Sequence, residues 1–204
     1  MHPELLAATS NPGKIEEIRA ILSPFKVKII TPQDLSLKLT VAETGATYLL
    51  NARLKAQAYH QATGIPVLAD DSGLEVDALD GAPGLHSARF SPKENADDAD
   101  RRDYLLEKLT GKARPWKAHF ECTAVLFLPG FGFIEKVGQC HGIIIPEERG
   151  DTGFGYDPIF YIPEYHATMA ELGPDIKNKI SHRAKALSAL MPVIASMFKN
   201  NNKG

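Results

Sequence analysis

The sequence has few of the features that mark secreted, membrane or nucleic-acid-binding proteins. It holds two cysteines in 204 residues, Cys122 and Cys140, which lie far apart and form no C-x-x-C pair, so we expect reduced thiols in a cytoplasmic protein. The net charge is −2 and basic runs are absent, which argues against a nucleic acid polymer or an anionic membrane as partner. Any site for an anion must therefore be local.

Long hydrophobic runs are also absent. The longest apolar stretch without charge runs from Cys122 to Ile134, is too short to span a bilayer, and contains Pro129 and Gly130. The first residues lack the basic region of a signal peptide. We therefore expect no membrane segment, while an apolar content of 44% suffices for a hydrophobic core.

The remaining pattern alternates strands and helices. Apolar or alternating runs predict strands at 5–8, 27–30, 67–69, 118–128 and 134–145. Helical spacing predicts helices directly after Asn11 and at 44–62, 98–109 and 181–198. The mixture predicts an α/β or α+β fold with a mixed sheet, as one domain over residues 1–198, with two lobes, and a polar C-terminal tail at 199–204.

The first candidate site is a polar loop that leads into a helix, made of Thr9, Ser10, Asn11, Pro12, Gly13 and Lys14. Asn11 can cap the helix and Pro12 suits its first position. Free N–H groups at the positive end of the helix dipole form a good phosphate site, and an anion there would explain a lysine in the first turn. A plain capped helix with a solvated lysine is the alternative, and the Walker pattern is absent.

The second candidate is Asp70-Asp71-Ser72-Gly73, directly after an apolar run. Adjacent carboxylates are costly there unless water or a cation solvates them, and Mg²⁺ takes one or two carboxylates together with phosphate oxygens and waters. Successive strand side chains point to opposite faces, so both can face one metal only if the chain turns at Ser72-Gly73. A turn with an Asx hydrogen bond is the alternative. No G-x-S-x-G pattern surrounds Ser72, so nothing supports it as a nucleophile.

The third candidate is Glu43, which we expect at the start of the long helix, where a carboxylate is favourable in any case. Asn51 and Lys55 are four residues apart and share a face of that helix. From there Lys55 could reach a phosphate, although most helical lysines are simply solvated.

Two further candidates lie in the C-terminal third. Gly153 and Gly155 flank Phe154, which allows the backbone to approach a flat ligand that Phe154 could stack on, or else forms a tight turn around a core phenylalanine. Lys177 and the Ser181-His182-Arg183 run precede or open the last helix, where His182 and Arg183 could donate to a carbonyl on a base. Such pairs are usually surface residues. None of the histidines has H-E-x-x-H spacing.

These motifs, in this order, resemble the inosine triphosphatase family over about residues 5–195. The matching segments are Thr9-x-Asn11-x-x-Lys14, Glu43-Thr44-Gly45, Asn51-Ala52-x-x-Lys55-Ala56, Ala69-Asp70-Asp71-Ser72-Gly73-Leu74, Gly81-Ala82-Pro83-Gly84, Ser87-Ala88-Arg89, Phe154-Gly155-Tyr156-Asp157-Pro158 and Ser181-His182-Arg183. The sequence departs from the family pattern at Thr152, where many relatives have glycine, and at His86, where tyrosine is usual.

The resemblance implies an α/β fold with an elongated mixed sheet, helices on both sides, and two lobes that flank a central substrate cleft. It also implies a cytoplasmic homodimer that binds Mg²⁺ and hydrolyses the purine nucleoside triphosphates ITP, dITP and XTP to the monophosphate and pyrophosphate. Such an enzyme removes deaminated purines from the nucleotide pool.

The resemblance also implies roles for the candidate residues. Thr9 to Lys14 would hold the triphosphate with help from Lys55, and Glu43 and Asp71 would bind Mg²⁺. Asp71 would act as general base, or else only as metal ligand. Lys14 and Asp70 would be catalytic residues beside it, and Ser72 would touch substrate. The base pocket would comprise Phe154, Gly155, Tyr156, Asp157, Lys177, His182 and Arg183.

Two alternatives remain open on the sequence. One is a hydrolase for pyrimidine nucleotides, and the other is a nucleotide sensor without turnover, although a sensor needs no water-activating carboxylates.

Overall fold

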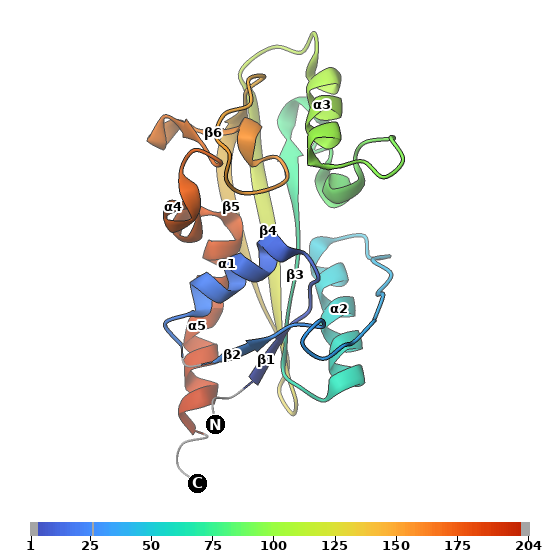
Figure 1. The fold of residues 1–204 in the computed structure, drawn as a ribbon, viewed down its shortest axis with the longest axis vertical. Coiled ribbons are helices and arrows are strands. Elements are labelled where there is room, and N and C mark those ends of the chain that lie inside the picture. Colours follow the sequence, from blue (N-terminus) through green and yellow to red (C-terminus); the bar gives the residue numbers. More distant parts are fainter. Residues whose placement is uncertain (1–3, 26, 201–204) are drawn as a thin grey trace. The chain divides into compact units, whose positions relative to one another are not determined.

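The computed structural model describes residues 4–25 and 27–200, with side chains as far as residue 196 (Figure 1). Its strands are β1 (Glu4–Ala7), β2 (Lys28–Ile30), β3 (Val67–Val76), β4 (Trp116–Leu128), β5 (Gly132–Ile144), β6 (Phe160–Ile162) and β7 (Ala167–Thr168). Its α-helices are α1 (Pro12–Leu22), α2 (Tyr48–Thr63), α3 (Asp98–Leu109), α4 (Gly173–Ile180) and α5 (His182–Asn200). Short 3₁₀ helices are η1 (Asp77–Leu79), η2 (Gly84–Arg89), η3 (Asp157–Ile159) and η4 (Pro163–Tyr165).

The strands form one mixed sheet in the order β2-β1-β3-β4-β5-β6-β7. Strand β1 pairs in parallel with both β2 and β3, in the register Leu6↔Ile30 and Leu6↔Val67. Strand β6 pairs antiparallel with β5 and with β7. The predicted α/β fold with a mixed sheet is therefore confirmed.

The chain divides into two compact units. Unit 1 comprises residues 1–71, 122–138 and 183–204, and unit 2 comprises residues 72–121 and 139–182.

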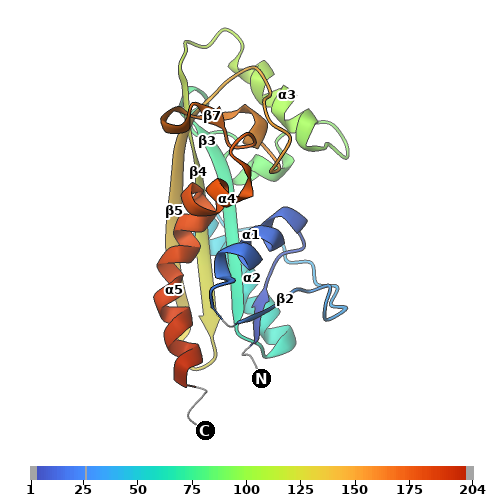
Figure 2. The same ribbon diagram turned by 60° about the vertical axis from the view of Figure 1, so that its left-hand side comes forward.

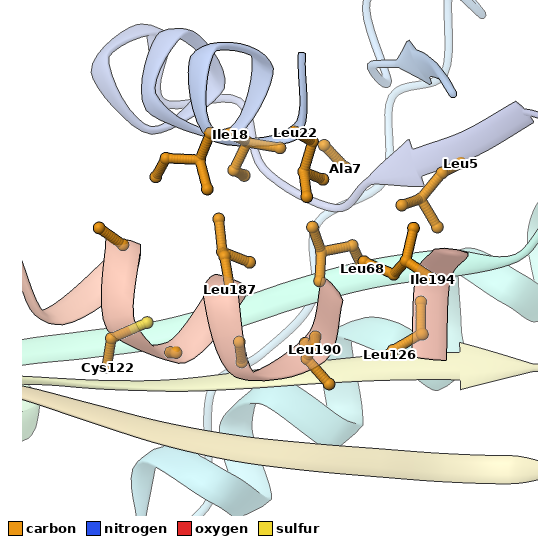
Figure 3. Packing of buried hydrophobic residues seen from close by; sticks show 14 of the residues in the cluster. Leu5, Ala7, Ile18, Leu22, Leu68, Cys122, Leu126, Leu187, Leu190 and Ile194 are labelled. Carbon is orange, nitrogen blue, oxygen red and sulfur yellow. The ribbon is translucent and has the colours of Figure 1, made fainter. Parts of the chain in front are cut away.

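In unit 1, helices cover both faces of the sheet, because successive apolar residues of β1 and β3 point to opposite faces. On one face, residues of α1 and α5 pack on Leu5, Leu68 and Cys122 (Figure 3). On the other face, α2 packs on the alternate residues Leu6 and Val67. Helix α5, red in Figure 2, runs along the face that it shares with α1. Each fully buried Leu or Ile contributes roughly 1.5–3 kcal/mol to folding.

In unit 2, a separate hydrophobic core forms around Leu105 and Leu109 of α3 and Phe120 of β4. Strands β5 and β6 and the 3₁₀ helix η3 contribute Ile144, Phe160 and Ile159 to it. Tyr156, from the glycine-rich loop, is also part of this core.

Several boundaries differ from the sequence predictions. The second helix begins at Tyr48 with Thr47 as its N-cap, not at residue 44, because the Thr47 side chain accepts the Leu50 N–H. The short helix α4 was not predicted, and Lys177 lies within it. The last helix continues through Pro192 to Asn200, and the rest of the predicted polar tail, residues 201–204, lies outside the described residues.

No helix among the described residues is long and apolar enough to cross a membrane.

Candidate active site

The two adjacent aspartates of unit 1 lie on opposite faces of the sheet. Strand β3 continues from Val67 to Val76, so the turn predicted at Ser72-Gly73 is absent. The expectation that such a turn lets both carboxylates face one metal is therefore wrong, because an extended strand alternates its side chains. Asp70 points to the face that carries α1 and α5, whereas Asp71 points to the face that carries α2.

Asp70 lies in a buried charge network. Its Oδ2 accepts hydrogen bonds from Lys14 Nζ at 2.9 Å and from Arg183 Nη2 at 3.0 Å. Arg183 is 1% exposed and forms a second ion pair with Glu17 of α1. Burial alone would raise the pKa of Asp70, but Lys14 and Arg183 outweigh it and hold this pKa below the usual aspartate range. The carboxylate therefore stays charged and fixes the position of the Lys14 ammonium.

Asp71 lies in a second cluster, on the α2 face. Its Oδ2 accepts a hydrogen bond from Asn51 Nδ2 at 3.0 Å, and its Oδ1 is 3.6 Å from Lys55 Nζ. The same Lys55 ammonium is 3.3 Å from Oε1 of Glu43. Burial raises the pKa of Asp71, with Lys55 and Asn51 opposing it. For Lys55, burial lowers the pKa, but the carboxylates around it outweigh burial and raise it, so the lysine stays protonated.

The loop before α2 holds Glu43 near this cluster. The Gly45 N–H donates to Asn51 Oδ1 at 2.7 Å, so one amide side chain bonds both to this loop and to Asp71. A Cβ on Gly45 would lie 2.6 Å from the Leu50 Cβ and 2.8 Å from Asn51 Oδ1, so only glycine fits this close approach. Glu43 reaches the cluster from this loop and not from the helix start that the sequence analysis expected.

The loop before α1 has the predicted cap. The Asn11 side chain accepts the Lys14 N–H at 3.1 Å, and Pro12 is in the first turn. Within the described part of the chain, no acceptor pairs with the N–H groups of Ser10 and Gly13. The helix therefore presents backbone donors at its positive end, beside the Lys14 ammonium, which suits a phosphate.

The donor set on the α2 face fits Mg²⁺. Glu43 and Asp71 supply two carboxylates within 3.6 Å of a single cation, the Lys55 ammonium. Among the described residues there is no group of three or more His, Cys, Asp and Glu side chains that would form a protein-only metal cage. Two hard oxygen donors, completed by phosphate oxygens and waters, are what Mg²⁺ takes in such sites.

Unit 2 brings three of the predicted base-pocket residues together. The Lys177 ammonium pairs with the buried Asp157 carboxylate and lies 4.4 Å from the centroid of the Phe154 ring. The Phe154 N–H donates to Asp157 Oδ2 at 2.8 Å. Phe154 itself is only partly buried.

Other predicted pocket residues have different surroundings. Tyr156 is 4% exposed, and its hydroxyl donates to the Ser87 carbonyl at 2.9 Å, which indicates a core role. Burial raises its pKa. His182 stacks on the Phe120 ring at 4.8 Å. Arg183 belongs to unit 1, where its guanidinium bonds to Glu17 and Asp70, and Ser72 is half-buried on β3.

The motif order and this geometry agree with the comparisons with known proteins. The family model described as the Ham1 family matches residues 5–193.

The chain belongs to the Ham1 family.

Curated relatives named dITP/XTP pyrophosphatase include one from Thermus thermophilus, 45% identical over 92% of this chain and 90% of its own length. Another, from Aquifex aeolicus, is 43% identical over 96% and 98% of the two chains. A solved structure of a HAM1 protein from Coxiella burnetii has a TM-score of 0.85 at 39% identity, covering 95% and 99% of the two chains. The family resemblance predicted from the motifs is confirmed.

The two departures from the Ham1-type motifs do not distort the backbone. Thr152 has no positive φ, so glycine is not required there, and its hydroxyl donates to the Ala170 carbonyl. His86 is exposed on η2.

Two residues of this Ham1-family site were not assigned to it from sequence. Glu17 pairs with Arg183, and its place on the same face of α1 as Ile21 was a signal, because a glutamate at a core-facing helical position requires a buried partner. Asn51 was placed on the face of Lys55, but only the tertiary fold reveals its bond to Asp71.

Proposed function

We propose that the protein hydrolyses purine nucleoside triphosphates that carry a deaminated base, such as ITP, dITP and XTP, to the monophosphate and pyrophosphate in the presence of Mg²⁺. The single observation that carries the proposal is the cluster around Asp71, where two carboxylates and Lys55 meet. The names of the curated relatives, dITP/XTP pyrophosphatase, support the same activity.

The reaction needs charge compensation along the triphosphate. A water oxygen bonds to the α-phosphorus, the bridging oxygen leaves with the pyrophosphate, and the water loses a proton. The helix N-terminus with Lys14 binds the phosphate oxygens, and Lys55 offsets the charge that grows on the leaving group. Asp70 and Arg183 hold Lys14 in place and touch no substrate in this scheme.

Asp71 is the carboxylate assigned to orient the attacking water or to accept its proton. Without Mg²⁺, burial raises its pKa above that of an exposed aspartate. A Mg²⁺ ion bound to the same carboxylate would stabilise its charged form and weaken it as a base. Glu43 and Asp71 would hold Mg²⁺, which, when bound, would stabilise negative charge on the phosphate oxygens.

Base recognition is assigned to unit 2. Hypoxanthine and xanthine present an acceptor O6 and a donor N1–H, whereas adenine presents a donor and an acceptor at these positions. A site that donates to O6 leaves its donors without partners when adenine binds, which discriminates strongly. Lys177 and Phe154 are the residues that supply a cation and a stacking face.

The same proposal includes that the protein is a homodimer and acts in the cytoplasm.

The test is a substrate panel of ITP, XTP, GTP and ATP with and without Mg²⁺, with the products resolved. Release of monophosphate and pyrophosphate from ITP and XTP, in preference to ATP and only with Mg²⁺, is the expected result. Lys14→Ala should lower turnover by ~10²-fold, by analogy with the loss of an oxyanion donor. Binding of ITP without any product would instead indicate a sensor, and preference for pyrimidines would refute the base assignment.

A further inference from the structure

The glycine-rich loop of unit 2 is held from outside by helix α3. Both backbone polar groups of Gly155 bond to side chains of this helix. The Gly155 N–H donates to Asp98 Oδ2 at 2.7 Å, and Arg102 Nη1 donates to the Gly155 carbonyl at 2.9 Å. Asp98 and Arg102 are four residues apart and therefore share one face of α3. We call these two residues the α3 clamp.

The α3 clamp is itself held in place by other side chains. Arg102 binds the Glu148 carboxylate with two nitrogens, at 2.6 and 3.0 Å, and its side chain is 12% exposed. Asp98 pairs through its other oxygen with Arg101. The planar guanidinium of Arg102 spans Glu148 and Gly155 at once, which a lysine ammonium does not do with the same geometry.

The loop needs such support because its own backbone is permissive. Gly153 and Gly155 have φ of +78° and +64°, so Phe154 lies between two left-handed glycines. Glycine adopts such conformations at no steric cost but is also free to leave them. On the Phe154 side, the Asp157 carboxylate accepts the Phe154 N–H. On the other side of Phe154, the α3 clamp fixes the N–H and the carbonyl of Gly155.

The direction of the Phe154 ring depends on the peptide groups that flank it. We propose that Asp98 and Arg102 are positioning residues for base recognition: by fixing both polar groups of Gly155 they hold Phe154 in the orientation that stacks on the purine. This inference rests on the proposed function. The α3 clamp touches neither the phosphates nor the Asp71 cluster in this scheme, so its loss should weaken base binding and leave chemistry intact.

The test variants are Arg102→Met and Asp98→Ala, with Lys108→Met and Asp103→Ala as matched controls. The controls remove one cation and one anion from the same helix, and neither residue bonds to the loop. Pyrophosphate release is measured with ITP, XTP and GTP as substrates. We expect KM for ITP to rise about tenfold in each clamp variant, with kcat within about twofold of the wild type.

Two further variants separate positioning from a loss of folding. Asp98→Asn keeps an oxygen that can accept the Gly155 N–H and should restore KM to within about threefold of the wild type. Arg102→Lys keeps the charge without the planar fork and should still raise KM. Amide hydrogen exchange without nucleotide gives an independent readout: peptides covering residues 150–158 should exchange faster in the clamp variants than in the controls.

The outcomes distinguish the inference from the proposed function. An active wild type with unchanged KM in both clamp variants overturns the inference alone. A fall in kcat at constant KM also overturns it, because the residues would then act on chemistry. A wild type that releases no pyrophosphate from any of the three substrates refutes the proposed function, and the inference with it.

Discussion

The same substitution at the two adjacent aspartates of β3 should have different effects: at Asp70 it should lower stability, and at Asp71 it should lower turnover. Asp70→Asn removes a buried charge that bonds to Lys14 and Arg183. Asp71→Asn removes a buried charge whose carboxylate pKa is already raised. Both residues are less than 10% exposed and occupy the same strand, so each variant is the matched control of the other.

The expected changes in unfolding free energy follow from the direction of each pKa shift and from the partners that each substitution leaves behind. The lowered pKa of Asp70 means that its charge stabilises the folded state, and removing one partner of a buried ion pair costs about 3–5 kcal/mol. Arg183 keeps Glu17 as a partner, but at 1% exposure water cannot replace the carboxylate that Arg183 and Lys14 both lose. The raised pKa of Asp71 means that its charge is unfavourable in the fold, and Lys55 keeps Glu43 as a partner. Asp71→Asn should change the free energy of unfolding by less than about 1 kcal/mol.

The assay is equilibrium unfolding in urea at pH 7 without Mg²⁺, together with turnover of ITP with Mg²⁺ at a temperature where both variants are folded. Asp70→Asn should lose about 3–5 kcal/mol of its free energy of unfolding, whereas Asp71→Asn should keep its stability and lose turnover by ~10²-fold or more. Equal losses of stability in the two variants would refute the argument that the charge of Asp70 stabilises the fold whereas the charge of Asp71 serves catalysis.

Three further changes test the close approaches and the buried charge. Gly45→Ala should lower turnover and destabilise the fold by about 1–3 kcal/mol, because its Cβ would lie 2.6 Å from the nearest side-chain atom; turnover and urea unfolding would check this. Gly153→Ala places a Cβ 2.2 Å from Asp157 Oδ2 and should raise KM for ITP, whereas Gly111→Ala, with equal backbone strain and no contact within 4 Å, should leave KM unchanged. The stability difference between wild type and Asp70→Asn should be constant above pH ~5 and shrink below pH ~4, as the unfolded-state carboxyl of Asp70 becomes protonated; urea unfolding at several pH values measures it, and a difference independent of pH would contradict the assignment.

Much of the fold could be predicted because its signals are local. The cap at Asn11 and the helix at 98–109 both depend on residues within a few positions of each other. The start of α2 was predicted too early because Ala- and Leu-rich composition does not indicate which of several polar residues caps the helix. Helix α4 was not predicted because it is short and opens with Gly173 and Pro174.

The candidate site was predictable as a set of residues and not as an arrangement. Lys14, Asp70, Asp71 and Lys55 were all named from sequence, and in unit 1 the structure pairs Lys14 with Asp70 on one face of the sheet and Lys55 with Asp71 on the other. The expectation of a turn at Ser72-Gly73 was wrong, because a glycine that follows two aspartates is compatible with a turn and also with a strand. Only pairing within the sheet decides between them, and that depends on distant residues.

The sequence by itself determined which chemical groups the chain has and in which local elements they lie. Capping, strand alternation and helical spacing act over a few residues, so the order of motifs sufficed to identify the family. Only the tertiary structure decided which charges meet, because Arg183 reaches Asp70 across 113 positions of the chain and Gly155 reaches Asp98 across 57. Such contacts follow from packing the whole chain. For this reason, the α3 clamp and the different roles of Asp70 and Asp71 are visible only in the folded protein.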